Sequence, residues 1–441
     1  MHPWRYNAKK SMLPLRLILR ALAILGLFWL HLLVYGFGWL GLLLSGAGRA
    51  RRQALQGATL VELLRGLGAT FIKIGQFMST RGDLLPPHLL AALQELQDRV
   101  GPFPYVEVRR ILQAELGRPP EEEFAELDPY PVASASVAQV HRGVLADGRV
   151  VAVKVLRPRI EHTVSFDLMI LRGFARMLAL VPAVRALGPV AVVDEFGHAL
   201  RQQLDFTIEA ENNRRFAESF ATDATVGVPR LVEELCSKRV LCMEYVVGAK
   251  ILGETWDPPR AELLARAGFR MLLKMIFLDG FVHADLHPGN LLVTSADGGD
   301  RIMLLDVGLV ARLSGAHRGA LAALLAAWAT QDAGRICQIM LALAPGPPER
   351  DPAPLRAAVE DLLARYRSIA LAEVQLGGVL LEITRLMRRH HVRLEPALTM
   401  IIVAIGVVEG VGRQLAPQLD LAREALAFFA TLTPEQRAAF A

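Results

Sequence analysis

Two short polar segments in the second half of the sequence carry residue types suited to phosphoryl transfer. The sequence HADLHPGN occupies residues 283–290, and LLDVG follows at residues 304–308. Oxygen ligands suit Mg²⁺, and kinase-type folds use two carboxylates and an amide at such a spacing to hold Mg·ATP. The spacing predicts that Asp285 faces the phosphoryl acceptor as base or positioning residue. It also predicts that Asn290 and Asp306 hold the metal ion.

Lys154 is the candidate phosphate ligand. It ends the sequence VAVK at residues 151–154, on a predicted strand. A lysine on the inner face of a strand needs an anionic partner, and nucleotide phosphates with a helix carboxylate would supply one. We expect Glu209 to be that carboxylate, with Glu211 as the alternative because helix phase alone does not separate them. A solvated lysine on an edge strand is the alternative to this interpretation.

A small-residue loop stands where a protein kinase has its glycine-rich phosphate loop. Its members Ala133, Ser134, Ala135 and Ser136 include no glycine, so the loop lacks the freedom that glycine has at positive φ. Backbone amides and the two hydroxyls could still meet phosphates, although an ordinary small-residue turn is the alternative. We also assign Glu244, at the end of a short predicted strand, to the nucleotide site.

Two histidines flank Asp285. His283 is expected to brace the loop through backbone hydrogen bonds rather than to act in catalysis. His287 is a candidate for contact with the transferred phosphate or the acceptor.

The elements around these residues can be read from hydrophobic periodicity. Strands are predicted at 137–143 and 150–155, joined as a hairpin, and at 240–245, 291–293 and 302–305. Helices are predicted within 52–100, at 105–116, 160–179 and 189–219, and through most of the chain from 259 onward. After Gly308 the sequence turns at once into a helix at 319–328, without a recognisable activation segment or Ala-Pro-Glu. The platform that docks a peptide substrate is therefore not expected.

Composition narrows the protein class. The chain has 441 residues, of which 53% are apolar, and a net charge of +5. A modest basic excess suits ATP and an anionic lipid surface but is too diffuse to indicate nucleic acid. The three cysteines form no Cys-x-x-Cys pair, so we expect neither a disulfide framework nor a zinc site, and a reducing compartment fits.

The N-terminal segment is the strongest membrane candidate. Residues 21–44 contain no Asp, Glu, Lys or Arg, and a helix of that length reaches roughly 36 Å, against ~30 Å for a hydrocarbon core. A spanning helix or tight anchor is expected; a cleaved signal peptide and a buried or interface-lying helix are the alternatives. Basic residues flank both ends, so orientation follows instead from the need for cytosolic ATP. The tail, 355–440, reads as amphipathic helices whose most apolar run, 397–408, is expected to be a core helix too short to span.

The helical segment before the loop carries a further signature. The sequence FIKIGQ at 71–76 is followed by STR at 79–81, DLLP at 83–86 and LQD at 96–98. With the alanine-rich loop and HADLHPGN, these residues make the chain similar to the UbiB/ABC1/ADCK family of atypical kinase-like proteins over about 55–415. The resemblance implies that the N-terminal helices cover the kinase cleft, with Lys73 and Gln76 facing the nucleotide. Residues three apart share a helix face; an ordinary exposed face is the alternative.

The chain departs from the family at two places. Gln203 stands where the family usually has a glutamate, so a charge is replaced by a hydrogen-bonding amide. The family's C-terminal membrane helices are not evident in the sequence, so the N-terminal segment would supply membrane attachment.

These features predict an α+β, two-lobed protein-kinase-like fold. It comprises a small mixed β-sheet N-lobe and a helical C-lobe, with a helical N-terminal extension and a membrane helix. The predicted domains are an anchor at 1–50, a helical extension at 51–125, an N-lobe with inserted helices at 126–248 and a helical C-lobe at 249–441.

The resemblance implies a membrane-associated atypical kinase or ATPase that binds ATP and Mg²⁺ and supports ubiquinone or other isoprenoid-lipid biosynthesis. It would work at the cell inner membrane with its catalytic domain on the cytoplasmic side. Membrane lipids and quinone-biosynthesis enzymes are the expected partners, and nucleic acid is not. Two alternatives stay open: a small-molecule phosphotransferase of the aminoglycoside or choline kinase type, and a nucleotide-binding pseudokinase scaffold.

Overall fold

The chain divides into two compact units. The computed structural model describes residues 13–79, 85–94, 96, 101–185, 188–296, 299–344, 351–367, 376–390, 392 and 394–438. The first unit is Met1–Thr207 with Glu233–Cys242, and the second is Ile208–Val232 with Met243–Ala441. The four domains predicted from the sequence divide the chain differently, and their boundaries stay predictions.

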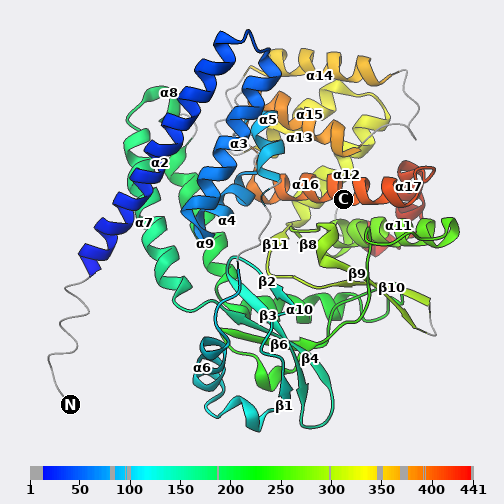
Figure 1. The fold of residues 1–441 in the computed structure, drawn as a ribbon. Coiled ribbons are helices and arrows are strands. Elements are labelled where there is room, and N and C mark those ends of the chain that lie inside the picture. The colour runs from blue at the N-terminus through cyan, green and yellow to red at the C-terminus, as the bar shows by residue number, and fades with distance from the viewer. Residues whose placement is uncertain are drawn as a thin grey trace. The chain divides into compact units, whose positions relative to one another are not determined.

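The first unit is mostly helical and carries one small sheet (Figure 1). Its helices are α2 (Leu13–Leu44), α3 (Arg49–Leu67), α4 (Ala69–Ser79), α5 (Pro87–Gln94), α6 (Tyr105–Leu116), α7 (Ile160–Leu178), α8 (Pro182–Arg185) and α9 (Pro189–Gln203), with short turns η1 (Pro120–Glu122) and η2 (Glu233–Leu235). The predicted helix at 105–116 is confirmed as α6, which ends where Gly117 takes a φ of 74°. Glycine is the residue that adopts this left-handed conformation without strain.

The sheet of the first unit is built on the predicted hairpin. Its strands are β1 (Phe124–Leu127), β2 (Ala133–Ser134), β3 (Ala138–Leu145), β4 (Val150–Leu156) and β6 (Val240–Glu244, whose last two residues belong to the second unit). They lie in the order β1-β3-β4-β6, with β2 paired to β3. The antiparallel pairing of β3 and β4 sets Val140 opposite Lys154, and this confirms the hairpin. Gly148, at a φ of 87°, closes its turn.

The helical extension packs tightly around its motif helix. Leu64, Phe71 and Leu93 are buried between α3, α4 and α5. A Cβ on Gly75 of α4 would lie 2.8 Å from Leu64 Cδ1 and would also overlap Leu96. Packing therefore requires a glycine in the sequence FIKIGQ. Residues 80–84 and 97–98 of the neighbouring motif segments lie outside the described residues.

The second unit contains the remaining helices: α10 (Phe206–Ser219, whose first two residues belong to the first unit), α11 (Pro258–Leu273), α12 (Gly315–Ala329), α13 (Ala333–Ala342), α14 (Ala353–Tyr366), α15 (Leu376–Arg389), α16 (Pro396–Leu415), α17 (Leu421–Thr431) and α18 (Pro434–Ala438). A π-helical turn, η3 (Lys274–Asp279), continues α11, and the 3₁₀ turn η4 (Pro288–Asn290) lies in the polar loop. The short strands are β5 (Val226–Gly227), β7 (Ala249–Lys250), β8 (Phe281–His283), β9 (Leu291–Ala296), β10 (Gly299–Leu304) and β11 (Val310–Arg312).

These strands form two small sheets that frame the polar loop. One has the order β5-β10-β9-β7, and the other pairs β8 with β11 in antiparallel fashion. The predicted strands at 291–293 and 302–305 are thus confirmed as β9 and β10. Residues 297–298, between these two strands in the sequence, lie outside the described residues. The prediction that the chain from 259 onward is helical apart from these two strands was wrong at β8 and β11, which are three residues long and too short to show a period.

The predicted helix at 189–219 was wrong in its continuity. It is two helices, α9 and α10, and Gln203 is the last residue of α9. The side chain of Asp205 accepts hydrogen bonds from the Thr207 backbone N–H at 3.1 Å and hydroxyl at 2.6 Å. A carboxylate in this position caps a helix N-terminus, so Asp205 starts α10 anew.

Two described helices are long and apolar enough to cross a membrane, Ile18–Leu44 and Pro396–Leu415. The expectation that the apolar run at 397–408 is too short was wrong, because it belongs to the 20-residue α16. Its placement as a core helix is confirmed, since half of its apolar window is buried. Leu398, Ile401 and Val408 lie in the core of the second unit.

Candidate functional site

The polar loop begins at the end of β8. His283, the last residue of β8, is buried and pairs with Val310 of β11. Its Nδ1 accepts a hydrogen bond from the Asp285 backbone N–H at 3.1 Å. The Asp285 side chain is exposed. The expectation that His283 braces the loop is confirmed.

Burial lowers the pKa of His283, against the raising effect of the Asp285 and Asp306 carboxylates. Desolvation disfavours the charged ring, so the imidazole is neutral at pH 7. A neutral ring can offer Nδ1 as an acceptor to Asp285. The charge state of the histidine and the shape of the loop are thus consistent.

Asn290 is tied to both ends of the loop. Its side-chain Nδ2 donates to the backbone carbonyl oxygen of Asp285 at 3.1 Å. Its backbone carbonyl oxygen accepts a hydrogen bond from the Leu305 N–H at 3.0 Å. The second bond sets Asn290 beside the end of β10, immediately before Asp306. Because the amide nitrogen serves the loop, the amide oxygen is the atom suited to a cation. His287 caps the 3₁₀ turn η4, because its Nδ1 accepts a hydrogen bond from the Gly289 N–H at 3.0 Å.

Asp306 lies in a turn that α10 holds in place. The Gly308 N–H donates to Asp306 Oδ1 at 3.2 Å. Asn212, buried on α10, donates from Nδ2 to the Val307 carbonyl oxygen at 3.0 Å. Sequence reasoning missed Asn212; its position three residues after Glu209, on the same helix face, was the available signal.

Glu209 lies against the same turn. A Cβ on Gly308 would lie 3.2 Å from Asp306 Oδ1 and 3.3 Å from Glu209 Oε2. The two carboxylates therefore approach Gly308 closely, which explains the glycine of LLDVG. Glu211, the alternative, is exposed and forms an ion pair with Arg214 at 2.8 Å. Glu209 is the inward-facing residue of the two.

This set fits a magnesium ion held together with a nucleotide. Asn290 and Asp306 offer oxygen donors, the ligands that Mg²⁺ prefers, and Mg²⁺ is usually bound by one or two carboxylates with phosphates and waters. Among the described residues, no three His, Cys, Asp or Glu side chains group as a metal cage.

Lys154 belongs to the first unit, whereas Asp285, Asn290, Asp306 and Glu209 belong to the second. Lys154 is half-buried on β4, and its Nζ lies 5.2 Å from the centroid of the Phe206 ring. A cation over an aromatic face is stabilised by the ring quadrupole. Its pairing with Glu209 stays a prediction.

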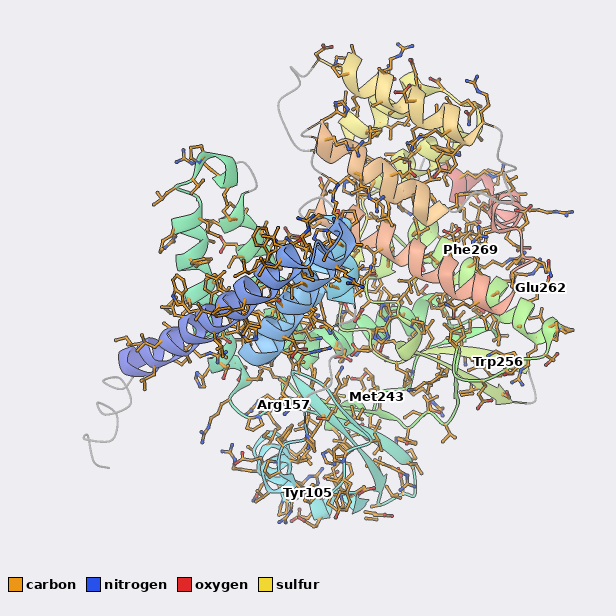
Figure 2. The ribbon with its side chains drawn as sticks, turned by 45° about the horizontal axis from the view of Figure 1, so that its top comes forward. Tyr105, Arg157, Met243, Trp256, Glu262 and Phe269 are labelled. Carbon is orange, nitrogen blue, oxygen red and sulfur yellow. The ribbon has the colours of Figure 1, made fainter. Side chains whose placement is uncertain are left out.

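Arg157 fixes the alanine-rich loop. From its place after β4 (Figure 2), it donates from Nε to the Ala135 carbonyl at 2.8 Å and from Nη2 to the Ser134 hydroxyl at 2.9 Å. Ser136 is fully buried, so a phosphate contact by its hydroxyl would require the loop to open. Hydrogen bonds from the Arg157 side chain thus hold the alanine-rich loop in its conformation. The contacts of 133–136 with phosphate stay predictions.

The motif helix α4 presents Lys73 and Gln76, both half-buried. Gln76 Nε2 donates to the Leu96 carbonyl oxygen at 3.2 Å, which ties α4 to the segment after α5. Glu244, in the second unit, forms an ion pair with Arg230 at 3.2 Å. The assignment of all three to a nucleotide site stays a prediction.

Two family descriptions and several known proteins match this chain. The ABC1 atypical kinase-like domain matches residues 95–340, and the UbiB helical domain matches residues 359–420. Two proteins named "Probable protein kinase UbiB", from Aeromonas hydrophila subsp. hydrophila and Aeromonas salmonicida, are 35% and 34% identical over 378 and 391 residues. The matches cover 84% and 86% of this chain and 69% and 71% of those proteins.

A solved structure agrees in fold. Rv3197 from Mycobacterium tuberculosis, solved in complex with erythromycin, superposes with a TM-score of 0.54 at 23% sequence identity, covering 81% of this chain and 92% of that one. The two-lobed kinase-like fold class and the resemblance found in the sequence are both confirmed. The chain belongs to the ABC1/UbiB family of atypical kinase-like proteins.

Proposed function

We propose that this chain binds Mg·ATP and transfers the γ-phosphoryl group to water or to an acceptor hydroxyl. The observation that carries the proposal is the hydrogen-bonded frame of Asp285, Asn290 and Asp306. Loop bonds and α10 fix the backbone of the loop and turn that carry these three oxygen-bearing side chains in the second unit. Such fixed positions suit phosphoryl transfer, where catalysis is mainly positioning and electrostatic stabilisation.

The roles follow from the chemistry of each side chain. The oxygen of the acceptor hydroxyl would bond to the γ-phosphorus while the bond between that phosphorus and ADP breaks. Asp285, exposed at the bend of the loop, would accept the proton that the hydroxyl loses. Asn290 and Asp306 would hold Mg²⁺, which when bound neutralises charge on the phosphate oxygens. Lys154, paired with Glu209, would bind phosphate from the first unit.

The chain would act at a membrane. α2 supplies an apolar helix with large exposed side chains, and the UbiB relatives support a role in ubiquinone or other isoprenoid-lipid biosynthesis. We place the protein at the cell inner membrane with the catalytic units on the cytoplasmic side, where ATP is available. Membrane lipids and quinone-biosynthesis enzymes would be its partners.

Two alternatives make different predictions. A small-molecule phosphotransferase would turn over with a soluble hydroxyl substrate and would not need the motif helix α4. A nucleotide-binding scaffold would bind Mg·ATP without appreciable turnover. The match to the ABC1 atypical kinase-like domain and the likeness to the UbiB relatives support the kinase or ATPase proposal over the first alternative.

The test is nucleotide binding and phosphate release by the purified full chain in vesicles that contain anionic lipid. Asp306→Asn is compared with wild type, and Asp361→Asn is the matched control because it neutralises an exposed carboxylate of the same unit. We expect Mg²⁺-dependent binding and turnover in wild type and the control, and loss of both in Asp306→Asn. Binding without turnover would support the scaffold. Absence of Mg²⁺-dependent binding in wild type would refute the site assignment.

A further inference from the structure

Helix α2 is docked on its own unit along most of its length. Figure 1 shows it running beside α3. Arg20 donates to the Leu67 carbonyl at 2.8 Å, Gln56 donates to the Tyr35 hydroxyl at 3.2 Å, and a Cβ on Gly38 would lie 3.1 Å from Leu55. Between residues 20 and 38 a helix rises about 27 Å, which is close to the ~30 Å of a hydrocarbon core.

The partner helix α3 is unsuited to the interior of a bilayer. Helix α3 carries exposed charged side chains, including the Arg65–Glu62 ion pair, in which both side chains are about half exposed. Arg51 is exposed on the same helix. A charged side chain at the bilayer centre costs about 2.5–3.5 kcal/mol even on insertion scales. With α3 attached over this length, α2 cannot cross a membrane without taking those charges with it.

The face of α2 opposite the docked residues is apolar from end to end. The docked residues recur every three or four positions, at 20, 24, 27, 31, 35 and 38, and are half-buried. On the other side of the helix a second stripe at the same spacing is exposed and apolar: Ile18, Leu22, Leu25, Trp29, Leu33, Phe37, Leu40 and Leu44. Leu19, Phe28, Leu30 and Val34, on the flanks of the helix, are exposed and apolar as well. A helix held by protein along one side and apolar on its other sides is suited to lie in a membrane surface.

Apolar surface continues from α2 onto α7. Arg20 binds the buried Asp167 of α7, and Leu171, one turn on, packs against the same helical cluster as α2. Phe174 and Leu178 continue that stripe of α7 at helical spacing and are exposed. Exposed Arg49 and Arg51, at the start of α3, follow the other end of α2. Basic residues at the edge of an apolar surface complement anionic lipid headgroups.

We propose that α2 lies in the plane of one membrane leaflet, held against α3 and α7, with its outer stripe in the acyl region, and does not span the bilayer. The proposal rests on the membrane attachment proposed above and specifies its form. Residues before and after α2 then lie on the same, cytoplasmic side. The residues along the outer stripe then all lie at the same shallow depth in the membrane.

The first experiment measures sidedness in the full chain. Single cysteines are placed at Lys10→Cys and Ser45→Cys, on either side of α2, in a Cys236→Ser background that removes the half-buried native thiol. A membrane-impermeant maleimide is applied to spheroplasts and to inverted membrane vesicles. We expect both positions to react in inverted vesicles and to be protected in spheroplasts. Reaction of the two positions from opposite sides would overturn the proposal while leaving membrane attachment intact.

The second experiment measures depth. Nitroxide labels at Leu25→Cys, Leu33→Cys and Leu40→Cys report oxygen accessibility in anionic vesicles, with Glu62→Cys on α3 as a control in water. We expect equal, shallow immersion at the three positions. A maximum at Leu33 with lower values at both ends would indicate a spanning helix, and water-like values at all three would also overturn the proposal. Recovery of the wild-type chain in the soluble fraction would instead refute the membrane attachment on which the proposal rests.

Discussion

Breaking the ion pair between Arg20 and Asp167 from one side should cost more stability than most single substitutions in the first unit. Arg20 donates from Nε to Asp167 Oδ1 at 2.7 Å and from Nη2 to Oδ2 at 3.0 Å. The same guanidinium donates to the Leu67 carbonyl oxygen. Asp167 is fully buried, and the Arg20 side chain is 30% exposed. Arg20→Ala would thus leave a buried carboxylate and a carbonyl without this donor.

Loss of one partner of a buried pair costs about 3–5 kcal/mol, and the partial exposure of Arg20 places the expectation near the lower end, about 3 kcal/mol. For a unit of roughly this size, 1 kcal/mol shifts the melting temperature by about 2–4 °C. We therefore expect Arg20→Ala to lower the Tm of the first unit by about 6–12 °C. Arg20→Lys keeps the charge but loses the bidentate geometry of the guanidinium. Its decrease in Tm should therefore lie between zero and that of Arg20→Ala.

The assay is thermal unfolding of the full chain in lipid nanodiscs, with limited proteolysis to assign the transition to the first unit. Arg65→Ala is the matched control, since it removes an exposed arginine from the same helical extension and should change stability by no more than about 0.5 kcal/mol. The double variant Arg20→Ala/Asp167→Asn should be more stable than Arg20→Ala, because no buried charge is left unpaired. Equal Tm values for Arg20→Ala and Arg65→Ala would refute this reasoning.

Three further outcomes follow from the structure. Gly308→Ala, which adds a methyl group between two carboxylates, should weaken Mg²⁺-dependent nucleotide binding about tenfold, or ~1.4 kcal/mol, with an unchanged Tm; calorimetric titration checks this. Burial lowers the pKa of His141 below its ordinary 6.5, so the unfolded chain binds the proton more readily and stability should fall as pH drops below about 6.5. In His141→Gln, denaturant unfolding should show a shallower pH dependence. Glu409→Gln should cost about 1–3 kcal/mol in the same assay, because the buried carboxylate accepts two backbone N–H groups at the start of α15.

Local patterns predicted those parts of the fold whose signals lie close together in the sequence. The β3–β4 hairpin and the strands on both sides of residues 297–298 follow from alternation and turn residues within a few positions. The catalytic-type spacing of Asp285, Asn290 and Asp306 is equally local. The structure adds the hydrogen bonds that hold the three together, through Leu305 and the loop carbonyls.

The rest depended on contacts between distant residues. Asp167 lies 147 positions from Arg20, and neither residue has a local signal that indicates its partner. The apolar composition of α2 predicted a membrane helix, but its docked face depends on α3 and α7. The strands β8 and β11 are defined by their pairing across 27 or more residues, which no window of hydrophobicity contains. The break between α9 and α10 could have been predicted from Asp205, because aspartate is favoured at the N-terminal cap of a helix.

The motif FIKIGQ shows how a family signature can combine packing with chemistry. Gly75 is required because α4 approaches Leu64 too closely for a side chain, and Gln76 ties α4 to the Leu96 carbonyl. Both contacts lie inside the first unit, so they explain these two residues without any nucleotide. Lys73 shares the helix face of Gln76, and a lysine contributes a charge that neither contact uses. A nucleotide role for this helix therefore has to be tested at Lys73, because changes at its two neighbours would alter the packing of the extension as well.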